Sequence, residues 1–218
     1  MNSNQEQQYS SIVKISAFTA NGNLTQLHAA LHEGLDNGLT ITVIKEVLLQ
    51  MYAYTGFPRC INSVNTLISV LHDREESGIQ DVLGVSSSPL PTNKSRYDIG
   101  TDIQTILAGK PILFPKGSYA DFIPEIDIFL KEHLFADIVA RNAVNLEKRE
   151  VATIAALTSL GGTDPQLTFH IGAGLNVGLT EAQATAIFSV IESDVDAEKG
   201  KNGSRILQQV IENRQKTA

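Results

Sequence analysis

One helix and the break that follows it carry the residue types that chemistry would use. The segment from Lys45 to Asn62 reads K-E-V-L-L-Q-M-Y-A-Y-T-G-F-P-R-C-I-N. It predicts a nearly all-apolar helix with one carboxylate, Glu46, then a Gly-Phe-Pro break and a second helix opening with Arg59 and Cys60. Free amides at a helix start beside an arginine suit an anion. We therefore expect a carboxylate-binding site at the break, against the plainer alternative that both charges are merely solvated.

Composition narrows the classes of protein that this chain can represent. With 218 residues, 42% of them hydrophobic, it can build a real core as one large or two smaller domains. A formal charge of −7 without a basic block argues against nucleic acid or an anionic membrane as partner. No apolar run reaches the roughly 18 residues of a membrane span, and the polar start predicts no signal peptide. The single cysteine, Cys60, excludes an internal disulfide and favours a cytoplasmic protein.

Helical periodicity recurs along the chain, and no stretch shows sustained strand alternation. The sequence therefore predicts an all-α fold. Residues 73–100 are rich in charged and turn-forming side chains and are expected to form an exposed connector. Thr180 and Gln183 have the spacing of a capping box. The predicted helices span residues 5–20, 24–37, 41–54, 58–72, 101–108, 121–135, 146–160, 165–177, 180–191 and 204–213.

An internal repeat supports two units. Shifting the chain by 140 positions places residues 22–40 on residues 162–180 without a gap, and eight of the nineteen positions are identical. The block G-L-x-x-G-L-T occurs in both copies, each time between two predicted helices. We predict a first repeat over residues 1–75, a connector over 76–120 and a second repeat over 121–218.

The differences between the two copies point to one shared site. Glu46 falls on Ala186 in the second copy, whereas His170 falls on Ala30 in the first. His170 lies on one helical stripe with the apolar residues Leu167, Ile171 and Leu175. This spacing places the histidine on the buried face of its predicted helix. Each copy thus holds a polar group that the other lacks, as expected if a composite site draws on both.

Three segments together resemble a known family. They are A-L-H-E-G-L-D-N-G-L-T, K-E-V-L-L-Q-M-Y-A-Y-T-G-F-P-R and Q-L-T-F-H-I-G-A-G-L-N-V-G-L-T. This pattern is similar to the carboxymuconolactone decarboxylase family, which includes alkylhydroperoxidase-like proteins, and it covers about residues 10–75 and 133–195. The resemblance implies two tandem helical repeats of this type, homo-oligomers that are trimers or hexamers, and a site between repeats or subunits.

The decarboxylase branch of that family implies a cofactor-free lyase or isomerase acting on a small unsaturated organic acid. Such a reaction needs a cation for the carboxylate, an apolar wall and one group that moves a proton. On this reading Arg59 is the clamp, His170 carries the proton, and Glu46 orients or tunes that histidine. The plainer alternative for His170 is a core histidine that donates to a backbone carbonyl.

The peroxidase branch implies a hydroperoxide substrate and a helix glutamate, a Cys-x-x-Cys pair and a following histidine. Glu46 matches the glutamate, but the window from Thr55 to Ile61 holds only Cys60, and Asn65 stands where the histidine is expected. A two-cysteine peroxidase is thereby disfavoured. A one-cysteine thiol reaction and a non-catalytic small-molecule binding protein remain as alternatives.

Further residues complete the predicted binding set. Tyr54, on the helix before the break, Cys60, after it, and His133 are candidates for substrate binding. The plainer alternatives are packing for Tyr54 and Cys60 and a helix-end charge for His133. His28 and His32 have a metal-compatible spacing, but no carboxylate or cysteine signature accompanies them, so we predict no metal site.

Overall fold

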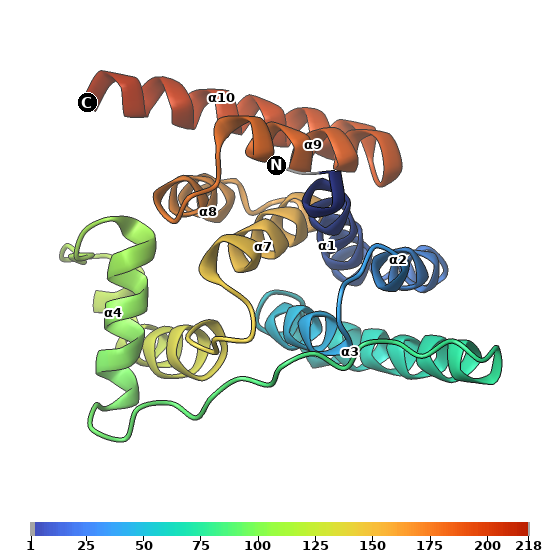
Figure 1. Cartoon of the computed structure of the whole chain (residues 1–218). Helices are drawn as coiled ribbons and strands as arrows, with labels where there is room; N and C mark the ends of the chain where they lie inside the picture. Colours follow the sequence, from blue (N-terminus) through green and yellow to red (C-terminus); the bar gives the residue numbers. More distant parts are fainter. Residues whose placement is uncertain (1–2, 218) are drawn as a thin grey trace.

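The computed structural model describes residues 3–217, and all regular structure in that range is helical, which confirms the all-α prediction. Helices α9 and α10 lie on one side, α3 on the opposite side, and α1 and α7 between them (Figure 1). The elements are α1 (Ser3–Asn21), α2 (Leu24–Asp36), α3 (Ile41–Glu76), α4 (Arg96–Ala108), α5 (Tyr119–Phe122), α6 (Pro124–Phe129), the π-helix η1 (Leu130–Val139), α7 (Leu146–Leu160), α8 (Asp164–Asn176), α9 (Glu181–Asp194) and α10 (Ala197–Thr217).

The main hydrophobic core joins the two ends of the chain. Ile12 of α1 and Leu48 of α3 lie in the same buried cluster as Ile154 of α7 and Phe188 of α9. Burying these side chains together removes their apolar surface from water, which is the main term that stabilises the fold. Helices from the first and the last third of the chain therefore share one core, while the two repeats and the boundaries drawn for them at residues 75 and 120 stay a prediction.

The bounds of the helices agree with a spacing of 140 residues. Helix α8 begins and ends 140 positions after α2. The side chain of Thr40 accepts a hydrogen bond from the amide of Val43 at the start of α3, and Thr180 caps α9 in the same way. There Gln183 closes the predicted capping box, which is confirmed. The repeat itself stays a prediction that these bounds support.

Helix α3 contains the break that the sequence predicts. Gly56 has φ 76° and ψ 164°, a conformation that is essentially restricted to glycine, and the helix resumes with Pro58 in its first turn. Two straight segments therefore meet at a corner, and the one before it carries Glu46.

The connector after α3 is held at its beginning. It runs back alongside α3 toward α4 (Figure 1). The carbonyls of Val82 and Leu83 accept hydrogen bonds of 2.9 and 2.8 Å from the first amides of α3, and Asp81 binds the guanidinium of Arg74 through two bonds. An unpacked connector was expected here, but the free amides at the start of α3 need acceptors, and this segment supplies them.

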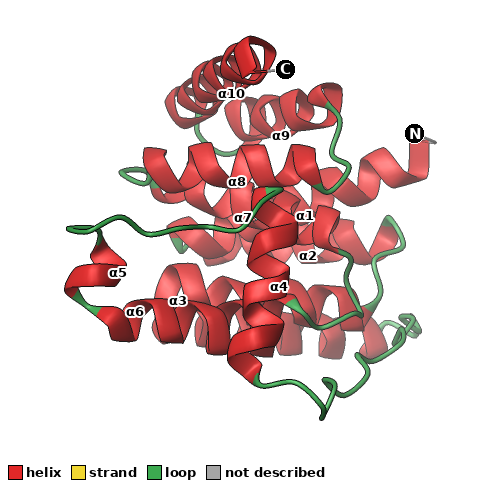
Figure 2. Cartoon of the chain, turned by 90° about the vertical axis from the view of Figure 1, so that its left-hand side faces the viewer, coloured by secondary structure: helices red, strands yellow, loops and turns green. Residues whose placement is uncertain are grey.

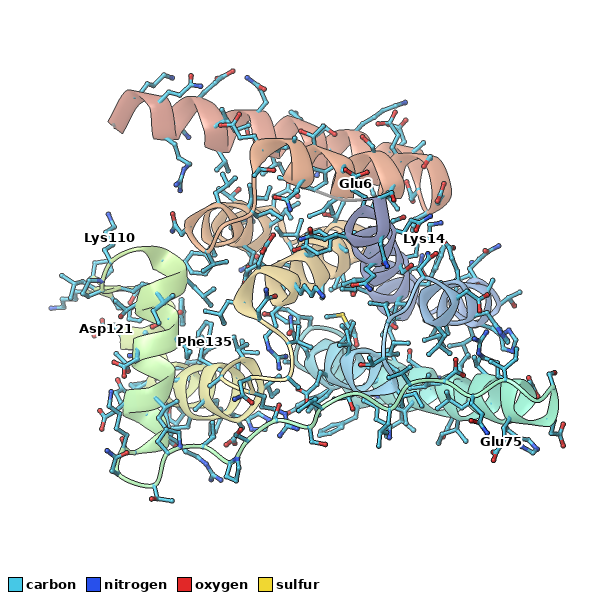
Figure 3. The ribbon with its side chains drawn as sticks, in the orientation of Figure 1. Glu6, Lys14, Glu75, Lys110, Asp121 and Phe135 are labelled. Atoms are coloured by element: carbon cyan, nitrogen blue, oxygen red, sulfur yellow. The ribbon has the colours of Figure 1, made fainter. Side chains whose placement is uncertain are left out.

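Residues 109–129 form an arm that leaves the end of α4 and returns through α5 and α6 (Figure 2). The helical pattern expected over residues 121–135 is divided, because Pro124 lacks an amide hydrogen and begins a new helix. Phe135, labelled in Figure 3, packs in a second core with Leu107 of α4 and Ala173 of α8. The charged side chains of Lys110 and Asp121, labelled in the same figure, lie on exposed residues of the arm.

Candidate functional site

Glu46 lies in the interior of the chain and is only 4% exposed. Arg141 donates to both of its carboxylate oxygens, at 3.0 Å from Nε and 2.7 Å from Nη2, and Arg149 donates from Nη2 at 2.9 Å. The plainer sequence-based alternative, a solvated charge, does not fit this burial. Glu46 faces Arg141, which precedes α7, and Arg149, which lies on α7, and these two arginines neutralise the buried charge.

The two arginines also decide the ionisation state of Glu46. Burial alone opposes the charged form, but hydrogen bonds from Arg141 and Arg149 outweigh it and lower the pKa of the carboxyl group. Gln50, one turn further along α3, accepts from Nη1 of Arg149 at 3.0 Å and donates to the hydroxyl oxygen of Thr153 at 2.7 Å. Arg141 and Arg149 together donate four hydrogen bonds to the two oxygens of Glu46, so its acceptor positions are already engaged by the protein.

Arg59 and Cys60 contact main-chain carbonyls within the chain, and their predicted role in ligand binding stays a prediction. The guanidinium of Arg59 donates from Nη1 to the carbonyl of Ala20 at the end of α1. The thiol of Cys60 is buried and lies 3.3 Å from the carbonyl of Leu48, to which it donates. Burial raises the pKa of this thiol, which opposes formation of the thiolate that a peroxidase needs.

His133 lies at the surface of η1, with its side chain 48% exposed. Its Nδ1 is 3.1 Å from a carboxylate oxygen of Asp137, and its Nε2 is hydrogen bonded to the hydroxyl of Tyr52. Both ring nitrogens are thus occupied by neighbours on η1 and α3, which is a structural use of the residue.

His170 on α8 has a carboxylate partner that sequence reasoning did not assign. Its Nδ1 is 2.7 Å from Oε2 of Glu150 on α7, and both residues are buried. The contact that we predicted for Glu46 is therefore made by Glu150. Nε2 of His170 has no hydrogen-bond partner among residues 3–217. Such a pairing fixes which nitrogen holds the ring proton and leaves the other nitrogen available.

A cavity of about 570 Å³ opens beside this histidine. It lies between α3, α4, α7, α8, η1 and the 109–129 arm, and its wall is mainly aromatic and aliphatic. Its polar side chains are those of Tyr54, Gln104, Tyr119, Gln166 and His170. No lysine, arginine, aspartate or glutamate is among the described residues that line it. Glu46, Arg59, Cys60 and His133 are outside the lining.

Two aromatic rings hold the imidazole of His170 in place. The ring of Phe169 meets it edge to face with centroids 5.2 Å apart, and the ring of Tyr54 does so at 5.9 Å. Burial, and then the charge of Glu150, raises the pKa of Tyr54, so its phenol stays neutral at ordinary pH. Of the six residues predicted for the site, the structure brings Tyr54 and His170 together in one cavity.

Glu150 and Gln104 are the site residues that sequence reasoning missed. The sequence carried little signal for Glu150, because it ends a run of four charged residues, 147–150, at the start of α7. Only the structure shows that Arg149 and Glu150 of this run are buried, where a charge needs a partner. Gln104 carried no local signal, since its role depends only on which cavity α4 borders.

Comparison with known proteins agrees with the predicted resemblance. Residues 124–209 match the model of the Carboxymuconolactone decarboxylase family, which confirms the similarity for that part of the chain. The matched region contains η1, α7, α8 and α9, and so includes both Glu150 and His170. A search of curated proteins gives no significant match. The similarity predicted for residues 10–75 stays a prediction.

Two kinds of feature, a membrane-spanning helix and a metal-binding cluster, are not found in the part of the chain that the structure describes. No helix among residues 3–217 is long and apolar enough to cross a membrane. Within the same range, no group of three or more histidine, cysteine, aspartate or glutamate side chains is arranged to hold a metal ion. The candidate site consists of the cavity and the His170–Glu150 pair at its wall.

Proposed function

We propose, on the similarity of residues 124–209 to the carboxymuconolactone decarboxylase family, that this protein is a cofactor-free lyase or isomerase acting on a small unsaturated organic molecule. One observation carries the proposal. A buried histidine is bound to a carboxylate through Nδ1, its Nε2 has no partner among residues 3–217, and the residue lines a mainly apolar cavity. Proton transfer next to a carbonyl group needs one such acid/base group and no cofactor.

The chemical step can be written for an isomerisation. Neutral Nε2 of His170 removes a proton from a carbon between a carbonyl group and a double bond, which leaves a dienolate and an imidazolium ion. The imidazolium then returns that proton to the far carbon of the former double bond, so that the double bond becomes conjugated with the carbonyl. No atom or electron is gained or lost. A lyase would use the second half alone, protonating the carbanion that remains when carbon dioxide leaves.

Glu150 is a positioning residue in this scheme. Its carboxylate, 2.7 Å from Nδ1, stabilises the imidazolium that forms during the step and holds the ring in one orientation. Phe169 and Tyr54 restrict rotation of the same ring. Water exclusion by the apolar wall strengthens these electrostatic interactions, since they act in a medium of low dielectric constant.

The prediction that the substrate is an organic acid has less support from the structure than the acid/base role of His170. Its clamp, Arg59, donates to the end of α1 and does not line the cavity. A carboxylate bound beside His170 would depend on the imidazolium as its only cation in the lining. We therefore propose the acid/base chemistry of His170 and treat the charge of the substrate as a separate question.

The proposal is tested by following conversion of 3-cyclohexen-1-one to its conjugated isomer by proton NMR. His170→Asn should lower the rate by about 10²–10⁴-fold, because the group that moves the proton is lost. Glu150→Gln should lower kcat by about 10–100-fold with KM little changed, since glutamine fills the same volume but carries no charge. His72→Asn, an exposed histidine outside the lining, is the matched control.

Two results would contradict the enzyme assignment. A His170→Asn variant with undiminished turnover would remove His170 from the mechanism. Binding of the ketone without any turnover by the unaltered protein would instead identify a non-catalytic small-molecule binding protein, the third of the predicted alternatives.

We also propose that the protein forms homo-oligomers, trimers or hexamers, through the second half of α3. Four apolar residues recur there at helical spacing and are exposed. They are Phe57 at 63%, Ile61 at 53%, Val64 at 38% and Ile68 at 60%. The positions 140 residues later, on α10, are alanine, lysine, serine and glutamine. A second copy of the chain that covers this stripe would remove its apolar surface from water.

Sedimentation velocity tests the assembly. Ile61→Glu should lower the molar mass in solution, because a charge in the centre of the stripe opposes its burial. Lys201→Glu, at the corresponding position of α10, should leave the molar mass unchanged. Equal molar masses for the unaltered protein and Ile61→Glu would exclude this stripe as the interface.

A further inference from the structure

We propose that the cavity beside His170 binds an uncharged, ring-sized molecule, and that Gln104 binds the polar group of that ligand. The inference rests on the proposed function of His170 and specifies its substrate class. It differs from the organic-acid expectation in the charge of the ligand, and it makes Gln104 a residue that determines specificity.

The charges around the cavity disfavour an anion. The lining contains no lysine or arginine among the described residues, so a bound carboxylate would lack a permanent counterion. Behind the wall lies the carboxylate of Glu150, which is held by His170 and acts on Tyr54 more strongly than the opposing charge of Arg149 does. Lys131 approaches the ring of Phe114 on the far side, but its ammonium is paired with Asp127 at 2.7 Å. Burying an unpaired carboxylate here would therefore be strongly unfavourable.

The environment of Tyr54, a residue of the lining, also disfavours a negative charge. Burial and the charge of Glu150 raise its pKa, so an anion at this wall is disfavoured even for a group that the protein itself supplies. A ligand carboxylate at the same wall would be subject to the same desolvation and the same repulsion.

Gln104 is a buried polar side chain whose hydrogen bonds are unused. It is 6% exposed, it lines the cavity, and it has no hydrogen-bond partner among residues 3–217. Its amide atoms are not among the fully enclosed, unpartnered side-chain atoms of the described residues, so they keep accessible surface that a ligand can reach. Because the amide offers two donors and one acceptor, it can bind a carbonyl or hydroxyl group without requiring a charge.

The size and the wall of the cavity fit a ring. A volume of about 570 Å³ is within the range of small-molecule sites. The rings of Phe114, Tyr119 and Phe169 belong to the wall, and aromatic side chains pack well against flat unsaturated molecules. Since an uncharged substrate has no carboxylate to lose, this inference favours isomerisation over decarboxylation for the proposed function.

The test compares two ligands that differ by one charge, coumarin and coumarin-3-carboxylate, by isothermal titration calorimetry in one buffer at about pH 8, where the ligand carboxylate is ionised. Coumarin should bind at least about tenfold more tightly than the carboxylate. Gln104→Leu should weaken coumarin binding by about fivefold, because it removes one hydrogen-bonding group. Gln80→Leu changes an exposed glutamine outside the lining and should leave both affinities unchanged.

The outcomes separate this inference from the proposed function. Equal or tighter binding of the carboxylate, no binding of coumarin, or an unchanged affinity in Gln104→Leu would each overturn it, while the ketone assay on His170 would be unaffected by those results. If Gln104→Leu does not fold, Gln104→Asn retains the amide at a shorter reach and should still weaken coumarin binding. Loss of turnover in the ketone assay, with neutral-ligand binding intact, would overturn only the catalytic proposal.

Discussion

Two buried glutamates, Glu46 and Glu150, are used in different ways by this molecule. Glu46 is bound by the guanidinium groups of Arg141 and Arg149, which engage both of its oxygens. Glu150 is paired with the imidazole of His170 through one oxygen. Both carboxylates are almost fully shielded from solvent, so burial does not distinguish them.

The difference lies in what the partners can still do. Arginine stays protonated under ordinary conditions, so the cluster around Glu46 holds elements together and moves no proton. Histidine exchanges a proton near neutral pH, and Nε2 of His170 borders a cavity. A glutamate on a buried helix is therefore a weak sign of catalysis until its partner is known.

The largest expected effect in this comparison is the loss of stability when Glu46 is neutralised. Glu46→Gln should lower the free energy of unfolding by about 3–5 kcal/mol, because Arg149 would remain buried without its counterion. Urea denaturation followed by circular dichroism measures the change. Glu132→Gln, at an exposed position of η1, should change it by less than about 0.5 kcal/mol. Coumarin binding by folded Glu46→Gln should be unaltered. Weaker binding would show that the Glu46 cluster and the cavity beside His170 are energetically coupled.

The same carboxylate predicts a pH dependence of stability. The pKa of Glu46 is lower in the folded chain than its ordinary value of 4.5, so the unfolded chain takes up the proton first as the pH falls. The contribution of Glu46 is complete above about pH 4.5 and is lost as the pH falls through the lower, folded-state value. Urea midpoints between about pH 3 and pH 6 should fall less steeply for Glu46→Gln than for the unaltered protein. Parallel curves would exclude Glu46 as a source of acid sensitivity.

A smaller effect is expected at the corner of α3, which belongs to the Glu46 region. Gly56→Ala should destabilise the fold by about 1–3 kcal/mol, because a side chain strains the backbone at φ 76° and ψ 164°. Gly172→Ala, inside α8 and with open space at its Cβ, should instead stabilise the fold by up to about 1 kcal/mol. Thermal unfolding of the two variants should shift in opposite directions. A destabilised Gly172→Ala variant would show that α8 is packed more closely beside His170 than the structure indicates.

The smallest effect is expected for Cys60→Ser. The oxygen can donate to the carbonyl of Leu48 as the sulfur does, so stability should change by about 1 kcal/mol or less. Ketone isomerisation should be unchanged, because Cys60 lies outside the cavity lining. Reduction of cumene hydroperoxide by the unaltered protein, abolished in Cys60→Ser, would instead support the thiol peroxidase alternative.

Much of the fold follows from local sequence signals. The apolar periodicity of α1, α2 and α9, the Thr180–Gln183 capping box and the glycine corner at Gly56 are local properties, and all three kinds of prediction are confirmed. Helix α4 begins at Arg96, earlier than expected, because Ser95 caps it. Helix α10 also begins earlier than predicted, at Ala197. Its first turns are mostly polar, so the sequence showed no apolar periodicity there. Such boundaries depend on caps and packing more than on composition.

For the site, too, local features were predictable from the sequence and contacts between distant residues were not. By itself the amino-acid sequence determined the helical class, the family resemblance and the candidacy of His170, because each depends on residues close together in the chain. Only the tertiary structure decided which carboxylate contacts His170, since Glu46 and Glu150 are equally acidic in a list of residues. The choice between them follows from the crossing of α7 with α8, which brings Glu150 to Nδ1, and from the arginines that already neutralise Glu46.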